Sequence, residues 1–431
     1  MSSTIFALAS APGRAGVGVV RLSGPLAGRV AESLAGPLPP PRRAVLRRLA
    51  HNDVEIDHAL VLWFPAPGSF TGEDVAEFHI HGGRAVREAL FAALSELGAR
   101  IAEPGEFSRR AVENGKLDLT RAEAVADLVE AETPAQLRQA LRQHDGALAY
   151  LYEGWRARLI AALGRAEAAI DFSDDGVGET EFTAARRVAT EIAKEIEEHV
   201  DDAGRGESLR EGLRLTILGP PNAGKSSLIN ALARRDVAIV SETPGTTRDV
   251  IEVRLNLGGY LLHVADTAGV RQTRDAIEAE GVRRALSHAA GGLTLLLLDG
   301  SLPDPYAGLP PDLPEPDLIV WNKADLGCER EGLSLSLKTG EGLSMLQSML
   351  QQKVQQKLDS DGAPLLTRPR HRQALSEALD ALRHGLKAPA DRPELLAEDL
   401  RLAMRAIGRI TGRVDVEELL DFVFRDFCIG K

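Results

Sequence analysis

The chain has 431 residues, a formal net charge of −12 at pH 7, 44% hydrophobic residues and 26% charged residues. This length predicts about three domains, and the composition excludes a small disulfide scaffold, a disordered chain and a collagen-like chain. The most apolar run, residues 293–298, is too short to cross a bilayer, so no membrane association is expected. Two distant cysteines without an export signal favour a reduced, cytoplasmic location. The acidic balance argues against indiscriminate binding along nucleic acid, although a local basic patch stays open.

Four segments differ in their patterning. Short apolar runs separated by Gly and Pro predict an α+β domain over residues 1–117, with strands at 4–10, 17–21, 59–64 and 75–80. Helical spacing predicts an α-helical domain over 118–209. Residues 210–369 alternate strand-like and helical runs, as in a doubly wound α/β domain, and the helical pattern returns over 370–431. The α/β domain is therefore expected to be inserted into a helical domain.

A phosphate-binding loop is predicted at residues 219–226, GPPNAGKS, which fit the pattern G-x-x-x-x-G-K-S between a strand-like and a helical run. The two glycines let backbone N–H groups and the helix N-terminus face phosphates. Lys225 is expected to neutralise the β- and γ-phosphates, and Ser226 to bind Mg²⁺. The predicted nucleotide contacts in this loop are Asn222, Ala223, Gly224, Lys225, Ser226 and Ser227.

Two further segments follow in the order that a GTPase requires. Residues 241–249, SETPGTTRD, form a Gly- and Pro-marked loop suited to switching with phosphate. Residues 264–269, VADTAG, end a strand with an Asp placed to hold Mg²⁺ through water and a Gly that can reach a γ-phosphate. The nucleotide contacts predicted here are Ser241, Glu242, Thr243, Pro244, Gly245, Thr246, Thr247, Asp266, Thr267, Ala268 and Gly269.

The segment LIVWNKAD, residues 318–325, is expected to select the base. The carboxylate of Asp325 can accept from both N1–H and the 2-amino group of guanine, whereas adenine would leave it facing a lone pair. An unpaired buried acceptor costs about 1–3 kcal/mol, so GTP is the expected ligand. Residues 336–338 fit the last guanine-contacting loop, with Leu337 where Ala is usual. The predicted base contacts are Asn322, Lys323, Ala324, Asp325, Ser336, Leu337 and Lys338.

Val270 follows the DTAG segment at the position where Ras-type enzymes carry a water-orienting glutamine. An apolar side chain cannot orient water, so catalysis must come from a partner's residue, from an ion that replaces an arginine finger, or from another carboxylate. Residues 271–280 supply several charged candidates. Asn222 is either a cation ligand beside the phosphates or an ordinary turn residue.

Three more segments, FTGED (70–74), PGEFSRRAVENGKLDLTRAEAV (104–125) and FCIGK (427–431), join these motifs. Together they resemble the tRNA modification GTPase family called MnmE or TrmE, over essentially the whole chain. The resemblance implies an α+β folate-binding-like N-terminal domain, an α-helical central domain and an inserted α/β P-loop GTPase domain.

The resemblance also implies K⁺-dependent GTP hydrolysis by a homodimer whose G domains associate. It implies an FAD-dependent partner of the MnmG type, in a heterotetramer that modifies C5 of the wobble uridine of certain tRNAs. The modification is a carboxymethylaminomethyl-type addition, with a 5-formyl- or methylene-type tetrahydrofolate as the carbon source. A ribosome-assembly GTPase that switches an RNA-binding module is the alternative, but it predicts a dedicated basic module and leaves the folate-like motifs unused.

Site residues follow from the resemblance position by position. It implies that Glu278 positions water, with Lys225 and Thr247 as further catalytic residues, and that Ser226 and Thr247 bind Mg²⁺. An ion near the phosphates would supply the charge of an arginine finger. The implied K⁺ ligands are Asn222, Ser241, Thr243 and Thr246. The implied folate contacts are Arg21, Glu77, Lys116 and Lys431. Pro220 and Pro244 depart from the usual family sequence.

Several features keep two interpretations. Glu77, His79 and His81 alternate along one strand, which fits a metal cluster or packed, hydrogen-bonded histidines. Cys428 is either a buried apolar residue or a functional thiol. The arginines at 401, 405, 409 and 413 form a stripe that either follows tRNA phosphates or is solvated and paired with acids at 415, 417 and 418. The basic cluster at residues 368–372 has the same ambiguity.

Overall fold

The computed structural model describes residues 3–172, 177–202, 204–234, 252–265, 292–309, 313, 315–327, 330–359, 364–414, 420, 421, 423–425, 427, 429 and 430. The chain divides into two compact units. The first comprises Met1–Ala126, Ala149–Glu153 and Ile407–Lys431, and the second comprises Asp127–Leu148 and Gly154–Ala406. Each unit therefore combines segments that are far apart in the sequence.

The first unit contains a six-stranded sheet in the order β3-β4-β5-β2-β1-β6, antiparallel except for the β1–β6 pair. Its strands are β1 (Ile5–Leu8), β2 (Ala15–Ser23), β3 (Val45–His51), β4 (Val54–Phe64), β5 (Val75–Gly82) and β6 (Arg100–Ile101). Helices α1 (Ala27–Ala35) and α2 (Arg84–Glu96) bury Val30 and Leu90 in the same core as Phe78. The strands predicted from the sequence are confirmed.

The two faces of this sheet differ because side chains alternate along each strand. On β5, Phe78 and Ile80 lie in the core with the helices, whereas Glu77 and His79 point to the other face and are partly exposed. Part of that other face packs under α3 (Glu106–Glu113), where Phe107 joins Ile5 and Ala7. The predicted folate residues on β2 and β5 therefore lie on the face that α1 and α2 leave uncovered.

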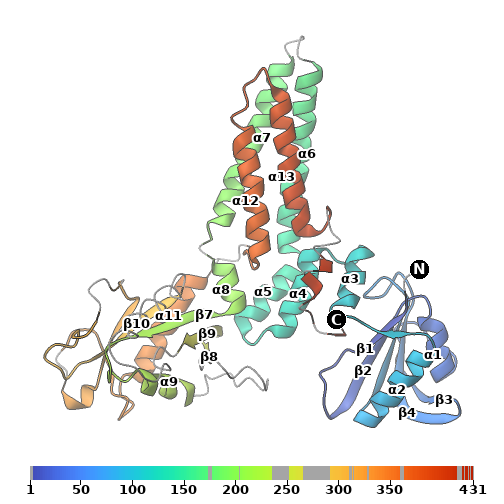
Figure 1. The fold of residues 1–431 in the computed structure, drawn as a ribbon, viewed down its shortest axis with the longest axis horizontal. Helices are drawn as coiled ribbons and strands as arrows, with labels where there is room; N and C mark the ends of the chain where they lie inside the picture. The colour runs from blue at the N-terminus through green and yellow to red at the C-terminus, as the bar shows by residue number, and fades with distance from the viewer. Residues whose placement is uncertain are drawn as a thin grey trace. The chain divides into compact units, whose positions relative to one another are not determined.

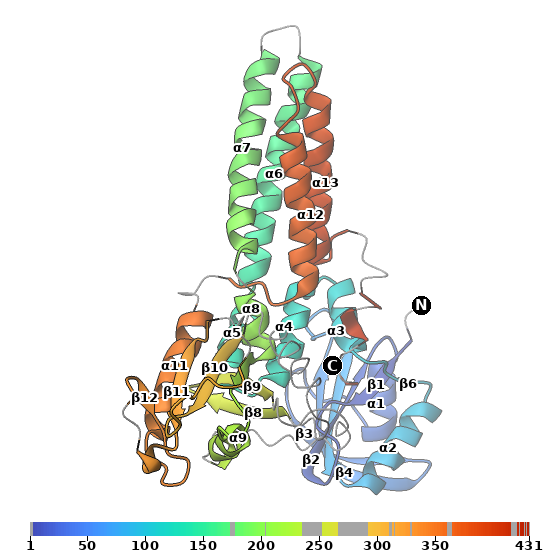
Figure 2. The same cartoon turned by 60° about the vertical axis from the view of Figure 1, so that its left-hand side comes forward.

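Four long helices lie side by side in a bundle (Figures 1 and 2). They are α6 (Ala147–Asp171), α7 (Val177–Val200), α12 (Pro369–Gly385) and α13 (Pro393–Thr411). Ion pairs join the helices across the bundle, namely Arg158–Glu195, Arg383–Glu197 and Arg401–Glu167. Two helices come from each side of the α/β segment in the sequence, as the predicted insertion requires. Among the described residues, no helix is long and apolar enough to span a membrane.

The second unit also contains a six-stranded sheet, in the order β12-β11-β10-β7-β9-β8. All of its neighbours are parallel except the β8–β9 pair. Its elements are β7 (Leu213–Leu218), α9 (Lys225–Arg234), β8 (Glu252–Leu257), β9 (Tyr260–Ala265), β10 (Leu293–Asp299), β11 (Leu318–Asn322), the 3₁₀ helix η2 (Ala324–Leu326), β12 (Leu333–Ser334) and α11 (Leu343–Leu358). Strand β7 lies between β9 and β10, which directs its carboxyl end into the crevice where such sheets bind ligands.

Three shorter helices, α4 (Leu119–Glu130), α5 (Pro134–His144) and α8 (Arg205–Glu211), precede this sheet in the chain. Helix α5 begins with a capping box, in which Thr133 and Gln136 satisfy each other's backbone N–H groups. The backbone N–H of Ala135 donates to the carbonyl of Gly259 in the β8–β9 turn, at 3.0 Å. The α/β sheet is thus anchored on α5 within the second unit.

Candidate functional site

The predicted phosphate loop connects the carboxyl end of β7 to the N-terminus of α9, as expected from the sequence. Asn222 has the left-handed φ of +62°, and its side chain is exposed at the turn. Ser226 is exposed in the first turn of α9, where a hydroxyl can reach a bound cation. The Nζ of Lys225 donates to the carbonyls of Gly219 and Pro220, at 2.7 and 3.0 Å. The ammonium group of Lys225 is thus hydrogen-bonded to the start of its own loop.

Both glycines of the loop are required by its geometry. Gly219 has φ +150°, and a Cβ there would lie 2.1 Å from the carbonyl oxygen of Leu297 on β10. Gly224 has φ +105°, and its Cβ would lie 2.4 Å from the side-chain nitrogen of Asn322. Contacts this short do not occur between real atoms, so a side chain at 219 would displace the loop from β10 and a side chain at 224 would displace the amide of Asn322.

Asn322 joins the phosphate loop to the predicted base-binding loops. Its side chain is buried, with 3% exposed, at the end of β11. Its Nδ2 donates to the carbonyl of Ala223 at 2.7 Å, and its Oδ1 accepts from the backbone N–H of Leu337 at 3.4 Å. The substitution of Leu for Ala at 337 leaves this backbone contact in place. One amide therefore fixes the spacing between the two loops.

Asp325 and Lys323 are held by separate partners. The hydroxyl of Ser336 donates to Oδ1 of Asp325 at 2.8 Å, and Lys338 lies 3.7 Å from its Oδ2. Lys323, which has φ +64°, pairs through Nζ with Asp299 at 2.6 Å. Burial raises the pKa of Asp299, but hydrogen bonds from Lys323 and Ser301 outweigh this effect and lower it. The aspartate at 325 is thus held in place by the loop at 336–338.

Asp299 was not singled out from the sequence. It ends the apolar run of β10, so an acid at the carboxyl edge of a buried parallel strand was the available signal. The predicted residues of the switch loop and the DTAG segment, from Ser241 to Thr247 and from Asp266 to Gly269, lie outside the described residues, as do Val270 and Glu278. The described part of the predicted nucleotide site therefore consists of the phosphate loop and the predicted base-contacting loops.

Arg21 and Glu77 are brought together in the first unit. They are paired in register on β2 and β5, and Nε of Arg21 donates to Oε1 of Glu77 at 2.9 Å. The guanidinium also lies over the rings of Phe70 and Phe107, 5.5 and 5.8 Å from their centroids. The sequence did not identify these two rings, although both lie within the family-like segments FTGED and PGEF.

Lys116 follows α3 in the chain and packs against the loop that carries Phe70. Its Nζ donates to the carbonyl of Pro67 at 2.9 Å, and its stem passes over Gly72, whose Cβ would lie 3.2 Å from Cγ of the lysine. Because Phe70 belongs to the same loop, Lys116 and Arg21 contact one continuous segment, residues 67–72. The structure thus brings three of the four predicted folate residues to one region of the first unit.

The C-terminal segment reaches the same unit. Ile429 forms an antiparallel bridge with Pro104, and a Cβ on Gly430 would lie 2.2 Å from the carbonyl oxygen of Leu8 on β1. Gly105, in the PGEF segment, lies against the ring of Phe424 and the Cβ of Phe427. Cys428 and Lys431 lie outside the described residues.

The histidines of β5 have different partners. Nε2 of His79 lies 3.5 Å from Glu77, whereas Nδ1 of His81 lies 2.7 Å from Asp57. Within the described part of the chain, no group of three His, Cys, Asp or Glu side chains is arranged to hold a metal ion. The geometry agrees with the interpretation of hydrogen-bonded histidines.

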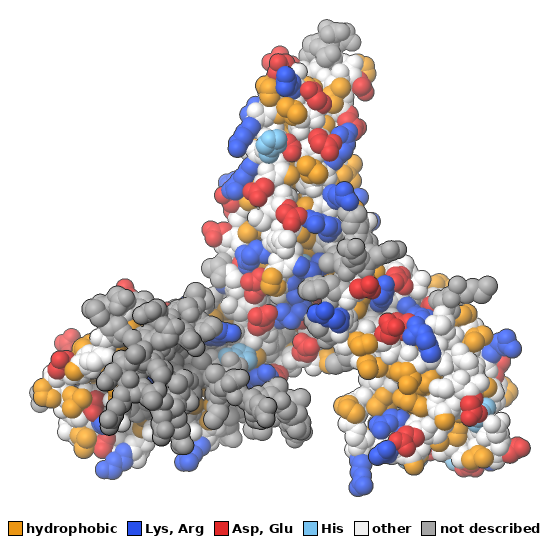
Figure 3. Space-filling model, in the orientation of Figure 1, with side chains coloured by type: hydrophobic (Ala, Val, Ile, Leu, Met, Phe, Trp, Pro, Cys, Tyr) orange, Lys and Arg blue, Asp and Glu red, His pale blue; other side chains and the backbone are white. Residues whose placement is uncertain are grey.

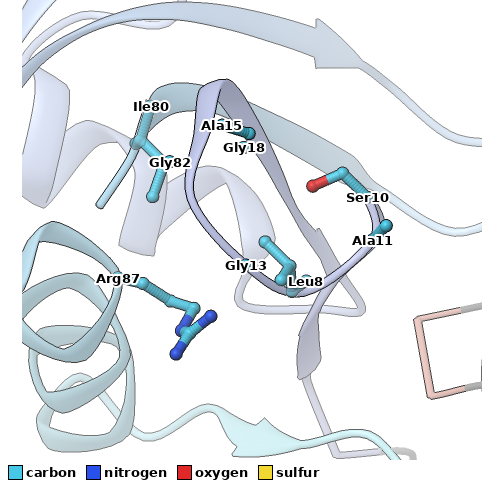
Figure 4. A pocket seen from close by; sticks show the side chains of 9 residues that line it. All are labelled: Leu8, Ser10, Ala11, Gly13, Ala15, Gly18, Ile80, Gly82 and Arg87. Carbon is cyan, nitrogen blue, oxygen red and sulfur yellow. The ribbon is translucent and has the colours of Figure 1, made fainter. Parts of the chain in front are cut away.

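A small hollow opens on the other face of this sheet (Figure 4). It lies where Gly18 of β2 meets Ile80 of β5, and Arg87 of α2 points toward it. The predicted contacts Arg21, Glu77 and Lys116 do not line it. It is therefore separate from the predicted folate residues.

The arginine stripe runs along α13 and ends just beyond it at Arg413, and its first and last members are paired. Arg401 donates to Glu167 at 2.9 Å, and Arg413 donates to Glu153 at 2.5 Å. Acidic and basic side chains are interspersed along the visible face of the bundle (Figure 3). The acids at 415, 417 and 418 lie outside the described residues. Gly408 lies inside α13 and does not interrupt it, whereas Gly412, with φ +79°, follows its last residue.

Comparison with known proteins identifies the family. The family descriptions "MnmE helical domain" and "GTP-binding protein TrmE N-terminus" match residues 119–428 and 4–116. The chain belongs to the MnmE family. The tRNA modification GTPase MnmE of Rhodospirillum rubrum is 54% identical to it over 453 residues, covering 99% of each chain. The same-named protein of Paramagnetospirillum magneticum is 55% identical over 443 residues, covering 100% of each.

Among solved structures, the G domain of the T. maritima FeoB iron transporter is 22% identical, with a TM-score of 0.27, and the match covers 34% of this chain and 99% of that one. Full-length similarity to the MnmE relatives, together with the assembled phosphate and base loops, makes this MnmE-family chain a P-loop GTPase.

Proposed function

We propose that this chain is a K⁺-dependent GTPase that acts as a homodimer with an FAD-dependent partner of the MnmG type. The pair would modify C5 of the wobble uridine of certain tRNAs, using a one-carbon unit from a tetrahydrofolate derivative. The observation that carries the proposal is the pair of hydrogen bonds made by Asn322, which links the phosphate loop to the loop predicted to contact the base. The full-length similarity to proteins named tRNA modification GTPase supports the tRNA substrate.

In this proposal the residues around GTP have distinct tasks. Lys225 leaves its two loop carbonyls for the β- and γ-phosphate oxygens, since its ammonium is attracted more strongly to an anionic oxygen than to a neutral carbonyl. Ser226 and Thr247 hold Mg²⁺, and Asp325 pairs with the guanine edge. Glu278 orients the attacking water. Exposed Ser226, at the start of α9, fits a hard cation because hydroxyl oxygens are suitable ligands for Mg²⁺.

The K⁺ ion would be held by Asn222, with Ser241, Thr243 and Thr246. Asn222 suits this role because it lies at the turn of the phosphate loop with its side chain exposed. An amide oxygen is a hard ligand of the kind that binds such ions. Bound there, K⁺ supplies positive charge next to the transferred phosphoryl group.

Turnover in matched KCl and NaCl buffers, without any partner, tests this proposal. We expect GTP turnover to rise by at least about 10-fold in KCl, since the ion replaces an arginine finger whose usual effect is larger. Asn222→Ala should remove most of this activation. Asn52→Ala is the matched control, since Asn52 also has a left-handed φ, of +51°, but lies in the β3–β4 turn. Equal, slow rates in both salts would favour a partner-supplied group and the RNA-assembly alternative.

The folate part of the proposal rests on Arg21, Glu77 and Lys116, with Lys431. Arg21 and Glu77 are mostly buried, with 23% and 16% of their side chains exposed, and aromatic rings flank the guanidinium. A carboxylate suits the amino and amide N–H groups of a pterin, and cationic side chains suit the carboxylates of its glutamate tail. The donor and acceptor types present therefore fit a folate.

Arg21→Ala is expected to weaken the binding of 5-formyltetrahydrofolate by roughly 10-fold or more, because a charge-assisted contact is lost and Glu77 loses its partner. Isothermal titration calorimetry measures this change. Arg87→Ala is the matched control, since Arg87 lines the hollow on the other face of the sheet. Equal affinities of the two variants for 5-formyltetrahydrofolate would contradict the proposed folate site. The proposal for the GTP site would not be affected.

A further inference from the structure

The chain enters and leaves the α/β segment through two connecting segments, and both of them hydrogen-bond to one carboxylate. The chain approaches the sheet through Arg210, near the end of α8, and returns to the bundle through Arg368, which caps the N-terminus of α12. Nε of Arg210 and NH2 of Arg368 both donate to Oδ1 of Asp127, at 3.0 and 2.5 Å. We call Asp127, Arg210 and Arg368 the Asp127 clamp. The side chain of Asp127 on α4 is only 9% exposed.

Neighbouring contacts hold the same two connections side by side. The side-chain amide of Gln136 on α5 donates to the carbonyl of Arg210 at 2.8 Å. The buried hydroxyl of Thr367 donates to Oε1 of Gln143, also on α5, at 3.0 Å. Gly206 of α8 faces the carbonyl of Leu366 so closely that a Cβ would lie 2.1 Å from it. The junction is thus held by hydrogen bonds, which restrict its geometry more than an apolar contact would.

Strands β7 and β9 connect this junction to the predicted nucleotide site. Strand β7 starts three residues after Arg210 and ends at Leu218, next to the phosphate loop. Strand β9 ends at Ala265, the residue before the DTAG segment, and Nε2 of His263 within it donates to the carbonyl of Glu211 at 2.8 Å. Strand β7 pairs with β10 on one side and with β9 on the other. It therefore forms a continuous structural connection between the phosphate loop and the residues beside Arg210.

We propose that Asp127 is a positioning residue that sets the orientation of the α/β segment on the helical bundle and lets that orientation follow the bound nucleotide. The carboxylate acts through Arg210 and Arg368 and touches neither GTP nor its phosphates. Charge-assisted hydrogen bonds from two guanidinium groups are strong and directional, so they favour one orientation over its neighbours. This inference rests on GTP binding by the chain and needs neither K⁺ nor folate.

The test compares Asp127→Asn with the matched control Glu195→Gln. Glu195 also accepts from an arginine, Arg158, at 2.7 Å and from Trp155 at 2.8 Å, but it lies within the bundle. Spin labels at Lys194→Cys on α7 and Gln356→Cys on α11 report the distance between the bundle and the α/β segment. The two native cysteines, Cys328 and Cys428, are changed to Ser in every sample. Double electron–electron resonance is recorded without nucleotide, with GDP and with GMPPNP.

In the wild type and in Glu195→Gln, we expect one main distance in each state and a shift between GDP and GMPPNP. In Asp127→Asn, the distribution should be about twice as wide and nearly the same in all states, because the loss of the charge weakens both arginine contacts. The affinity for a fluorescent GDP analogue should stay within about 3-fold, since no phosphate or base contact changes. The double variant Asp127→Asn/Arg368→Gln should be no broader than Asp127→Asn, because both act through one interaction.

Arg368→Lys provides a second variant that keeps the charge beside Asp127 but loses the planar guanidinium, and it should give an intermediate width. Narrow distances that still shift in Asp127→Asn, or equal broadening in Glu195→Gln, would overturn the proposal. A wild-type distance that is identical with GDP and GMPPNP would also overturn it. Failure of the wild type to bind the GDP analogue would instead contradict the GTP site, so the two failures are distinguishable.

Discussion

Gly219→Ala is expected to reduce GTP turnover by at least about 100-fold, or about 2.7 kcal/mol in activation free energy. The new Cβ would lie 2.1 Å from the carbonyl oxygen of Leu297, an atom of the β10 backbone that cannot move away without breaking the sheet. The φ of +150° adds conformational strain for any residue with a side chain. The loop must then leave the sheet edge, and its N–H groups no longer face the phosphates. Single-turnover GTP hydrolysis measures the loss.

Gly154→Ala is the control for this substitution. Gly154 lies within α6, where a Cβ would have no neighbour within 4 Å, and it has no left-handed φ. The same change there should stabilise the protein by roughly 0.5–1 kcal/mol and leave GTP turnover unchanged. Comparable losses of turnover in both variants would mean that the steric argument at the phosphate loop is wrong.

Asp325→Asn is expected to weaken GTP binding by roughly 10- to 100-fold, about 1.4–2.7 kcal/mol. In the proposed complex the carboxylate of Asp325 accepts from two N–H groups of guanine, whereas the amide of the variant would place its NH₂ group against the guanine 2-amino group. Xanthosine triphosphate has a carbonyl at that position, so the variant should bind it more tightly than GTP. Competition against a fluorescent GDP analogue gives both affinities.

The matched comparison for Asp325 is Ser336→Ala. The hydroxyl of Ser336 donates to Asp325 at 2.8 Å, so its loss should loosen the carboxylate without changing its charge. GTP binding should weaken by only about 3- to 10-fold, and GTP should remain preferred over xanthosine triphosphate. A preference for GTP in Asp325→Asn equal to that of the wild type would exclude the base-selecting role.

The strands and the phosphate loop could be predicted from the sequence because their signals are local. Residues 213–218 form a strand-like run in which four of the six residues are apolar, and the glycines at 219 and 224 are spaced for one loop shape, so β7 and its turn follow directly. The partners of the polar side chains could not be predicted in this way. Arg368 pairs with Asp127, which lies 241 residues earlier, and no local pattern indicates that pairing.

The roles of the charged residues also depend on long-range pairings that the sequence does not indicate. Arg401 looks like a phosphate contact in a stripe, but Glu167, far away in the sequence, lies beside it in the bundle. Asp299 ends an apolar strand, yet its pairing with Lys323 follows only from the order of the strands. The residue types in the motifs predict a site, whereas the tertiary structure determines which charged side chains pair with one another.

The bundle has a consequence for the order of folding. Arg383 on α12 pairs with Glu197 on α7, a separation of 186 residues, so these helices cannot meet until the whole α/β segment has been synthesised. Contacts of such long range are slow to form, and the apolar helix faces stay exposed in the partly folded chain, which makes it prone to aggregate. Because the two connections of the α/β segment lie together at Gly206 and Leu366, early folding of that segment shortens the effective loop and reduces the entropy lost on closure. Variants that slow folding of the α/β segment should therefore lower the yield of soluble protein during synthesis, even where the native helices are unchanged.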